Sequence, residues 1–89
     1  MVMMMDRLRL FHKALDACVK LQGQYPEDET IDSIIKQIQY LISLETGQNR
    51  DRSRLKDIVI GIQAAREIEP LDLGIAQLLY AVDIEAGRM

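Results

Sequence analysis

The feature that most constrains the fold of this 89-residue chain is a stripe of large aliphatic side chains in its second quarter. The stripe consists of Ile31, Ile34, Ile35, Ile38, Leu41 and Ile42. Spacings of three and four residues place these side chains on one side of an α-helix, because each residue turns the helix by about 100°. The segment therefore predicts an amphipathic helix that reaches about Glu45, with Gly47 as a left-handed stop.

Three other segments carry the same periodicity, and residues that start or stop helices bound them. Gly23 and the Tyr25-Pro26 pair end the first, because proline disfavours helix at the residue before it. Glu69-Pro70 breaks the third. Short polar side chains accept from free backbone N–H groups at helix starts, so Asp51 or Ser53 caps the third helix and Asp72 the fourth. The predicted helices cover about residues 6–22, 27–45, 53–68 and 73–87.

Short connections of about three to eight residues suit antiparallel neighbours in a small bundle. We therefore expect an all-α fold, a small antiparallel bundle of three to four helices, in a single domain spanning residues 1–89. Residues 1–5 are expected to be disordered or a variable start. The expected core residues of the other helices are Leu8, Phe11, Leu15, Cys18, Val19 and Gln22 in the first, Leu55, Ile58, Val59, Ile62 and Ala65 in the third, and Ile75, Leu78, Leu79, Val82 and Ala86 in the fourth.

Apolar residues also lie off these core faces, on a second side of three helices. Large exposed apolar areas usually mark contacts with another protein. The pattern therefore predicts a binding protein, but it does not distinguish a foreign partner from a second copy of the same chain. This second set consists of Leu10, Ala14, Ala17 and Leu21 in the first helix, Ile60 in the third, and Leu73, Tyr80 and Ile84 in the fourth.

The composition argues against several classes of function. The net charge is −3, whereas nucleic-acid binding needs an excess of basic residues at the phosphates. The single histidine, His12, borders an apolar helix face, no Cys/His set has zinc spacing, and no glycine-rich phosphate loop occurs. We therefore expect no catalytic, cofactor-binding or metal-binding residues, no cofactor and no nucleic-acid partner.

The single cysteine, Cys18, cannot form a disulfide within the chain, and its place on a predicted core face is typical of a small packed residue. No apolar run is long enough for a membrane span. The apolar start of the chain is too short for the core of a signal peptide. The sequence thus predicts a cytoplasmic protein without membrane contact.

Short motifs spread along the chain resemble those of a known family. They are Tyr25-Pro26, Lys36-Gln37-Ile38-Gln39-Tyr40-Leu41, Asp51-Arg52-Ser53-Arg54-Leu55 and the segment from Tyr80 to Arg88. In order and spacing, from about Asp6 to Arg88, they resemble the small helical immunity proteins that neutralise type VI secretion toxins of the NAD(P)-glycohydrolase kind. The matched positions are Gln37, Gln39, Tyr40, Asp51, Arg52, Ser53, Tyr80 and Gly87.

The resemblance implies a protein that binds a cognate toxin domain in a hetero-complex, covers its active site and performs no chemistry itself. The chain departs from the family pattern in the acidic segment after Tyr25-Pro26 and in the turn from Glu69 to Asp72. A toxin with a different nucleotide chemistry is therefore an alternative. A homodimeric helical adaptor, which would use the apolar faces for self-association, is a second alternative.

Nine residues are candidates for contact with the partner. Tyr40 and Lys36 point away from the core face of their helix, although neighbours on both sides of that helix would bury Tyr40 instead. Tyrosine suits an interface because it combines a large ring with a hydroxyl. The acidic cluster near Pro26 suits basic side chains in a toxin cleft, but stabilisation of the positive helix end is the preferred explanation. The candidates are Lys36, Gln37, Tyr40, Leu73, Tyr80, Ile84, Glu27, Asp28 and Asp32.

Overall fold

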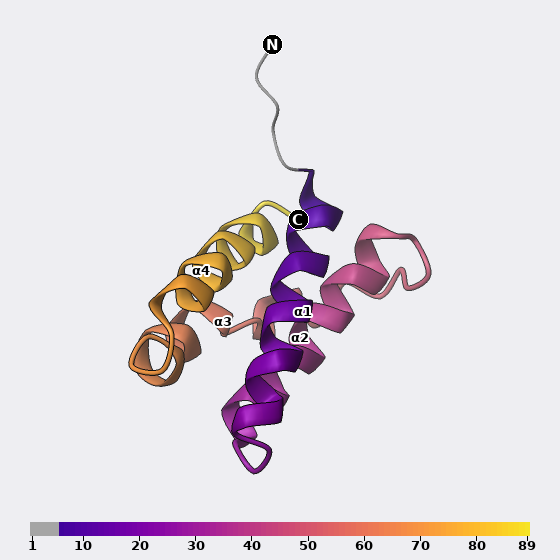
Figure 1. Ribbon diagram of the computed structural model, residues 1–89. Helices are drawn as coiled ribbons and strands as arrows, with labels where there is room; N and C mark the ends of the chain where they lie inside the picture. The colour runs from indigo at the N-terminus through magenta and orange to yellow at the C-terminus, as the bar shows by residue number, and fades with distance from the viewer. Residues whose placement is uncertain (1–5) are drawn as a thin grey trace.

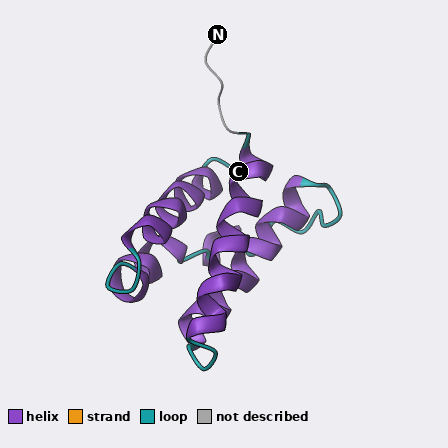
Figure 2. Ribbon diagram, viewed as in Figure 1, coloured by secondary structure: helices purple, strands orange, loops and turns teal. Residues whose placement is uncertain are grey.

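The computed structural model describes residues 6–89, and every regular element in that range is helical (Figures 1 and 2). The expectation for residues 1–5 lies outside the described residues. The predicted all-α class is confirmed. The elements are α1 (Arg7–Gln24), α2 (Glu29–Glu45), the 3₁₀ turn η1 (Leu55–Asp57), α3 (Ile60–Gln63), the π-helix η2 (Ala64–Ile68) and α4 (Leu73–Gly87).

Each of the three long helices begins with an aspartate cap. The side chains of Asp6, Asp28 and Asp72 accept from the backbone N–H three residues further on, at 2.9, 3.0 and 3.0 Å. Each bond satisfies one of the free donors at a helix start. The predicted stop after α2 is also present, because Gly47 has φ of 81°.

The long helices meet at one end of the molecule. Arg7, in the first turn of α1, donates to Glu45 at the end of α2 (3.3 Å) and to Glu85 near the end of α4 (3.1 Å). The hydrogen bond that Arg7 donates to Glu85 is the main cause of a raised Arg7 pKa. The start of α1 therefore lies beside the ends of α2 and α4, as an antiparallel arrangement requires. Figure 1 shows α1 crossing in front of α2, with α4 beside it and α3 behind.

The core face of α1 differs from the predicted one. Leu10, Ala14 and Leu21, which were assigned to a second face, are buried, while Val19 is 50% exposed. Because α1 packs against both α2 and α4, its buried side is set by two neighbours and is rotated from the simple stripe. The α2 stripe is buried as predicted except for Ile42, which is half-buried, and Leu44 joins it.

The predicted third helix was wrong in its start and in its face. The chain makes the short turn η1, passes through extended Ile58 and starts α3 only at Ile60. Ile60, Ala64 and Ile68 are buried, whereas Val59 and Ile62 are 42% and 58% exposed. The break at residues 58–59 resets the phase of the helix, and the wider π turn keeps Ile68 aligned with Ile60. In α4, Ala76 is buried, while the predicted core residues Ile75 and Leu78 are half-buried.

Candidate partner-binding surface

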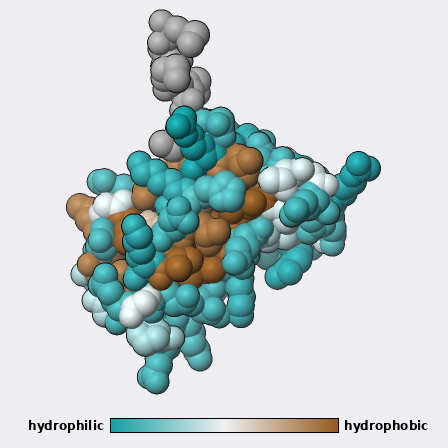
Figure 3. All heavy atoms as spheres, turned by 45° about the vertical axis from the view of Figure 1, so that its right-hand side comes forward, coloured by the Kyte–Doolittle hydropathy of each residue, from teal (hydrophilic) through white to brown (hydrophobic). Residues whose placement is uncertain are grey.

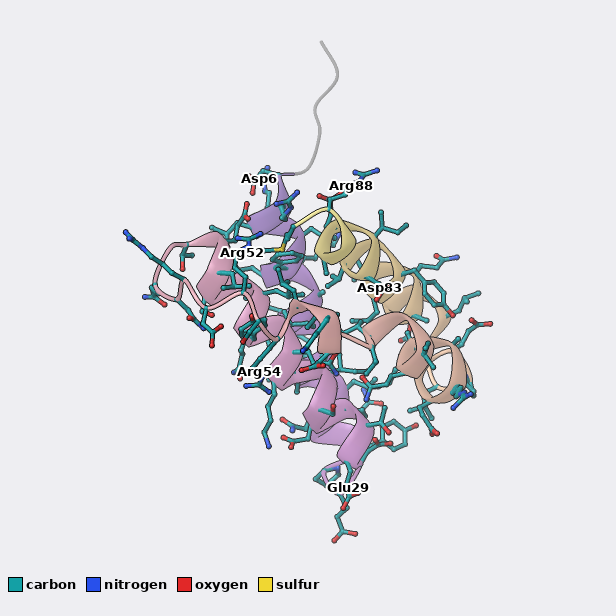
Figure 4. All side chains as sticks on the ribbon, turned by 180° about the vertical axis from the view of Figure 1, so that it is seen from behind. Asp6, Glu29, Arg52, Arg54, Asp83 and Arg88 are labelled. Carbon is teal, nitrogen blue, oxygen red and sulfur yellow. The ribbon has the colours of Figure 1, made fainter. Side chains whose placement is uncertain are left out.

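Residues 51–59, which we call the strap, return across α2 and are fastened to it at two points. The Tyr40 hydroxyl donates to the carbonyl oxygen of Asp51 at 2.6 Å. The side-chain oxygen of Gln37 accepts from the backbone N–H of Val59 at 2.9 Å. Figure 4 shows the strap from behind, with Arg52 and Arg54 on it. The two ends of the strap are thus held by side chains that are three residues apart on α2.

The start of the strap is a tight polar turn. The Asn49 side chain accepts from the N–H of Asp51 at 2.9 Å, and the Asp51 side chain accepts from the N–H of Ser53 at 3.0 Å. Hydrogen bonds from Ser53 are the largest cause of a lowered Asp51 pKa. Further along, Arg52 donates to the main-chain oxygen of Met89 at 2.5 Å. Local bonds of this kind fix a loop that has little regular structure of its own.

Between the strap and α2 lies an open groove of about 560 Å³. α2 supplies its floor, and the strap supplies the opposite wall. The groove brings together four of the candidates, Asp32, Lys36, Gln37 and Tyr40. Its lining consists of Asp32, Ser33, Lys36, Gln37, Gln39 and Tyr40 from α2, and Arg54, Asp57 and Ile58 from the strap.

Charged groups line this groove without being buried. Lys36 pairs with Asp32 at 2.9 Å, and the guanidinium carbon of Arg54 lies 5.7 Å from the centre of the Tyr40 ring. An exposed ion pair of this kind adds little stability, and a cation over an aromatic face adds about 0.5–1 kcal/mol at an exposed site. These side chains therefore remain available to a partner at small cost. Tyr40 is half-buried because the strap folds over a helix face that the periodicity left open.

Gln37 is the centre of a hydrogen-bond cluster. Its side-chain nitrogen donates to Gln63 at 2.7 Å and to the Ser33 hydroxyl at 3.2 Å, and Gln63 donates to that hydroxyl at 3.2 Å. With the bond to Val59, one amide links α2, the strap and the end of α3. Gln37 is thus half-buried, and it bonds to its neighbours at the edge of the groove.

The remaining candidates lie elsewhere. Glu27 is exposed in a shallow hollow with Tyr25, Pro26 and Asp28, and Asp28 is the N-cap of α2, so its side chain is engaged in the fold. The two explanations of the acidic cluster, partner contact and stabilisation of the helix start, thus apply to different residues. Asp28 stabilises the start of α2, and Glu27 is exposed and accessible to a partner.

On α4, Leu73 and Ile84 are 55% and 57% exposed. Tyr80 is half-buried, and its hydroxyl donates to Glu69, which raises the Tyr80 pKa. The space-filling view in Figure 3 shows one face where apolar side chains gather between hydrophilic ones. The surface of the single chain therefore keeps apolar areas, although Leu10, Ala14, Leu21 and Ile60 do not contribute because they belong to the core.

Sequence reasoning missed the strap side of the groove. The predicted helix over residues 53–68 included Arg54, Asp57 and Ile58, so none of them was a candidate for contact with the partner. The spacing of these residues does not show that the chain turns back over α2.

The part of the chain from residue 6 onward contains no cluster of three or more His, Cys, Asp or Glu residues arranged to hold a metal ion. In the same range, none of the helices is long and apolar enough to cross a membrane. Cys18 is buried, and burial raises its pKa to about 11, so its thiol stays protonated and unreactive at neutral pH.

The sequence and the structure of this chain both match proteins of one family. The family profile of Tsi6 matches residues 7–88. The immune protein Tsi6 of Pseudomonas aeruginosa PAO1 is 31% identical over 87 residues, which cover 94% of this chain and 93% of the relative. The solved structure of Tsi6 from Pseudomonas aeruginosa superposes with a TM-score of 0.86 at 27% identity, covering 92% of this chain and 95% of that chain. A chain in the structure of Tse6 in complex with Tsi6 gives 0.83 at 31% identity, with coverage of 94% and 93%.

Proposed function

The chain belongs to the Tsi6 family, and from this membership we propose that it is an immunity protein that binds a cognate interbacterial toxin domain. The match over residues 7–88 carries the proposal, and it is supported by a solved structure in which the relative Tsi6 is in complex with Tse6. The toxin is of the NAD(P)-consuming glycohydrolase kind that the sequence motifs indicate. The protein acts in the cytoplasm of the toxin-producing cell, covers the active site of the toxin and performs no chemistry itself.

The groove between α2 and the strap is the surface that we assign to this contact. It gathers Lys36, Gln39, Tyr40 and Arg54, and three of its lining residues, Gln37, Gln39 and Tyr40, are positions that match the family motifs. It contains Tyr40 and Arg54, and tyrosine and arginine are enriched among the residues that contribute most to protein interfaces. Glu27, Leu73 and Ile84 lie outside the groove and are candidates for the rim of the contact.

The test is direct inhibition of the toxin encoded beside this protein. Purified wild-type protein at a slight molar excess should stop NAD⁺ consumption by the toxin domain and should consume no NAD⁺ alone. Tyr40→Ala and Arg54→Glu should each weaken toxin binding by about 2 kcal/mol or more, the usual threshold for a dominant interface residue. Lys56→Glu, an exposed charge reversal outside the groove lining, is the matched control for Arg54. Full toxin activity in the presence of excess wild-type protein would disprove the proposal.

The exposed apolar residues of α4 favour a second candidate function, a homodimeric helical adaptor. Leu73 and Ile84 lie open on α4, and Ile62 is open on α3. If these residues form a dimer contact, the wild type should sediment as a dimer at micromolar concentration, and Ile84→Asp should convert it to a monomer. A wild type that remains monomeric up to about 100 μM and binds toxin one to one would exclude this candidate. A dimer that forms only above that concentration is weaker than a specific interface of ordinary affinity.

A further inference from the structure

We propose that Gln37 and the hydroxyl of Tyr40 are positioning residues, which fix the strap over α2 so that the partner meets a groove of defined width. This inference rests on the proposed function and assigns roles within the same surface. It separates two kinds of groove residue: those that a partner touches, such as Arg54, and those that hold the touching residues in place.

The two walls of the groove are held in different ways. The floor is α2, a helix of 17 residues whose position is fixed by its buried stripe. The opposite wall is the strap, whose only regular element is the three-residue turn η1. Segments with few internal backbone bonds open at low free-energy cost. The width of the groove therefore depends on what holds the strap.

The hydrogen bonds from α2 hold both ends of the strap. Tyr40 holds its start through Asp51, and Gln37 holds its end through the N–H of Val59. Val59 precedes α3 and offers no side-chain cap of its own. Without Gln37 the Val59 N–H would exchange its bond to α2 for a bond to water, so this end of the strap would lose its attachment. The groove residues on the strap lie between these two fastening points, so their positions depend on both bonds. They are Arg54, Asp57 and Ile58.

The chemistry of each bond explains why these residue types are needed. The ring of Tyr40 supports Arg54, while its hydroxyl alone reaches Asp51. The Gln37 amide accepts from the strap with its oxygen and donates to Gln63 and Ser33 with its nitrogen, so one planar group bonds in both directions. A leucine of similar size removes both functions. A glutamate keeps the acceptor for Val59, and the Gln63 amide can turn to donate to it.

If the strap samples open positions, only a fraction of the molecules presents the complete groove, and the apparent association slows by that fraction. Loss of one hydrogen bond corresponds to about a fivefold change in such an equilibrium. Tyr40→Phe and Gln37→Leu should therefore each lower the association rate with the toxin domain, by up to about fivefold where the open strap predominates in the variant. The dissociation rate should change by less than about twofold, because the closed complex retains its contacts.

The experiment measures hydrogen exchange of the strap amides in the free protein and toxin-binding kinetics for the same variants. Tyr40→Phe and Gln37→Leu should speed exchange at residues 52–59 and slow association, and Gln37→Glu should restore both. Gln77→Leu is the matched control for Gln37→Leu, because it removes an exposed amide on α4, away from the strap. This control should behave as the wild type.

The outcomes separate the two proposals. Faster strap exchange with unchanged association would overturn the positioning role while leaving the proposed function intact. The same holds if exchange stays at the wild-type rate, or if binding falls only in proportion to a lowered melting temperature. A wild type that binds no toxin would overturn both proposals.

Discussion

Gly61 stands where the start of α3 meets α4, and its lack of a side chain is required there. The side chain of Asp83 accepts from its N–H at 3.1 Å and occupies the place of a β-carbon, which would lie 2.7 Å from one carboxylate oxygen. Figure 4 shows Asp83 on α4 facing this turn. At the level of single residues, a side chain from another helix thus decides which residue α3 can carry.

Gly61→Ala should lower the free energy of unfolding by about 1–3 kcal/mol, because Asp83 must move and the Gly61 N–H loses its partner. Gly23→Ala is the control. Gly23 is helical with open space around its β-carbon position, so alanine there should raise the free energy of unfolding by about 0.5–1 kcal/mol. Urea denaturation of the three proteins measures both effects. Equal effects of the two substitutions would contradict the role of Asp83.

Cys18 makes stability depend on pH in the alkaline range. Burial raises the pKa of its thiol from 9.0 to about 11, so the folded state holds the proton more tightly than the unfolded state. The stabilisation is complete below pH 9 and is lost as pH rises toward 11. It amounts to about 2–3 kcal/mol, from 1.36 kcal/mol per pKa unit.

Comparison with Cys18→Ala isolates this effect, because other titrating groups are common to both proteins. At pH 7 the variant should be less stable by about 1 kcal/mol through lost packing. The gap should close and then reverse between pH 9 and 11 in urea denaturation curves. A gap independent of pH would show that the thiol is not held in its neutral form by the core.

At the scale of helices, the sequence correctly predicted a helix whose buried side follows a single stripe of apolar residues. It failed where contacts with other elements determine which side of a helix is buried. The core of α2 and the aspartate cap of α4 follow from local patterns. The position of the strap does not follow from local patterns, because Tyr40 and Gln37 are distant in sequence from Asp51 and Val59, the residues to which they bond. For the same reason, four of the six groove residues on α2 were among the candidates, and none of the three on the strap was.

The reset phase of α3 gives a prediction for two neighbouring isoleucines. Ile60 is buried and Ile62 is 58% exposed, the reverse of the sequence prediction. Ile60→Ala should cost about 2–5 kcal/mol of unfolding free energy through a core cavity. Ile62→Ala should change it by no more than about 0.5 kcal/mol. Thermal and urea denaturation would favour the continuous helix if Ile62→Ala proved the more damaging change.

At the scale of the whole molecule, Arg7 joins the ends of three helices through Glu45 and Glu85. Arg7→Met keeps much of the aliphatic stem and removes the charge. The melting temperature should fall by several degrees at low salt, since about 1 kcal/mol shifts it by roughly 4–8 °C in a domain of this size. The difference should shrink in 1 M NaCl. Lys36→Met, which breaks the exposed pair with Asp32, is the control and should have less effect. A shift independent of salt would assign the role of Arg7 to packing.

The capping of α3 by other helices has a consequence for the order of folding. Gln37 binds the N–H of Val59 and Asp83 binds that of Gly61, so the start of α3 is satisfied from α2 and α4 and has no cap of its own. Together α3 and η2 span only residues 60–68, and a helical stretch of that length is not stable alone. We therefore expect α3 to form after the docking of α2 and α4, on the native side of the transition state. Gly61→Ala should then speed unfolding and leave the folding rate nearly unchanged, with a φ-value near zero.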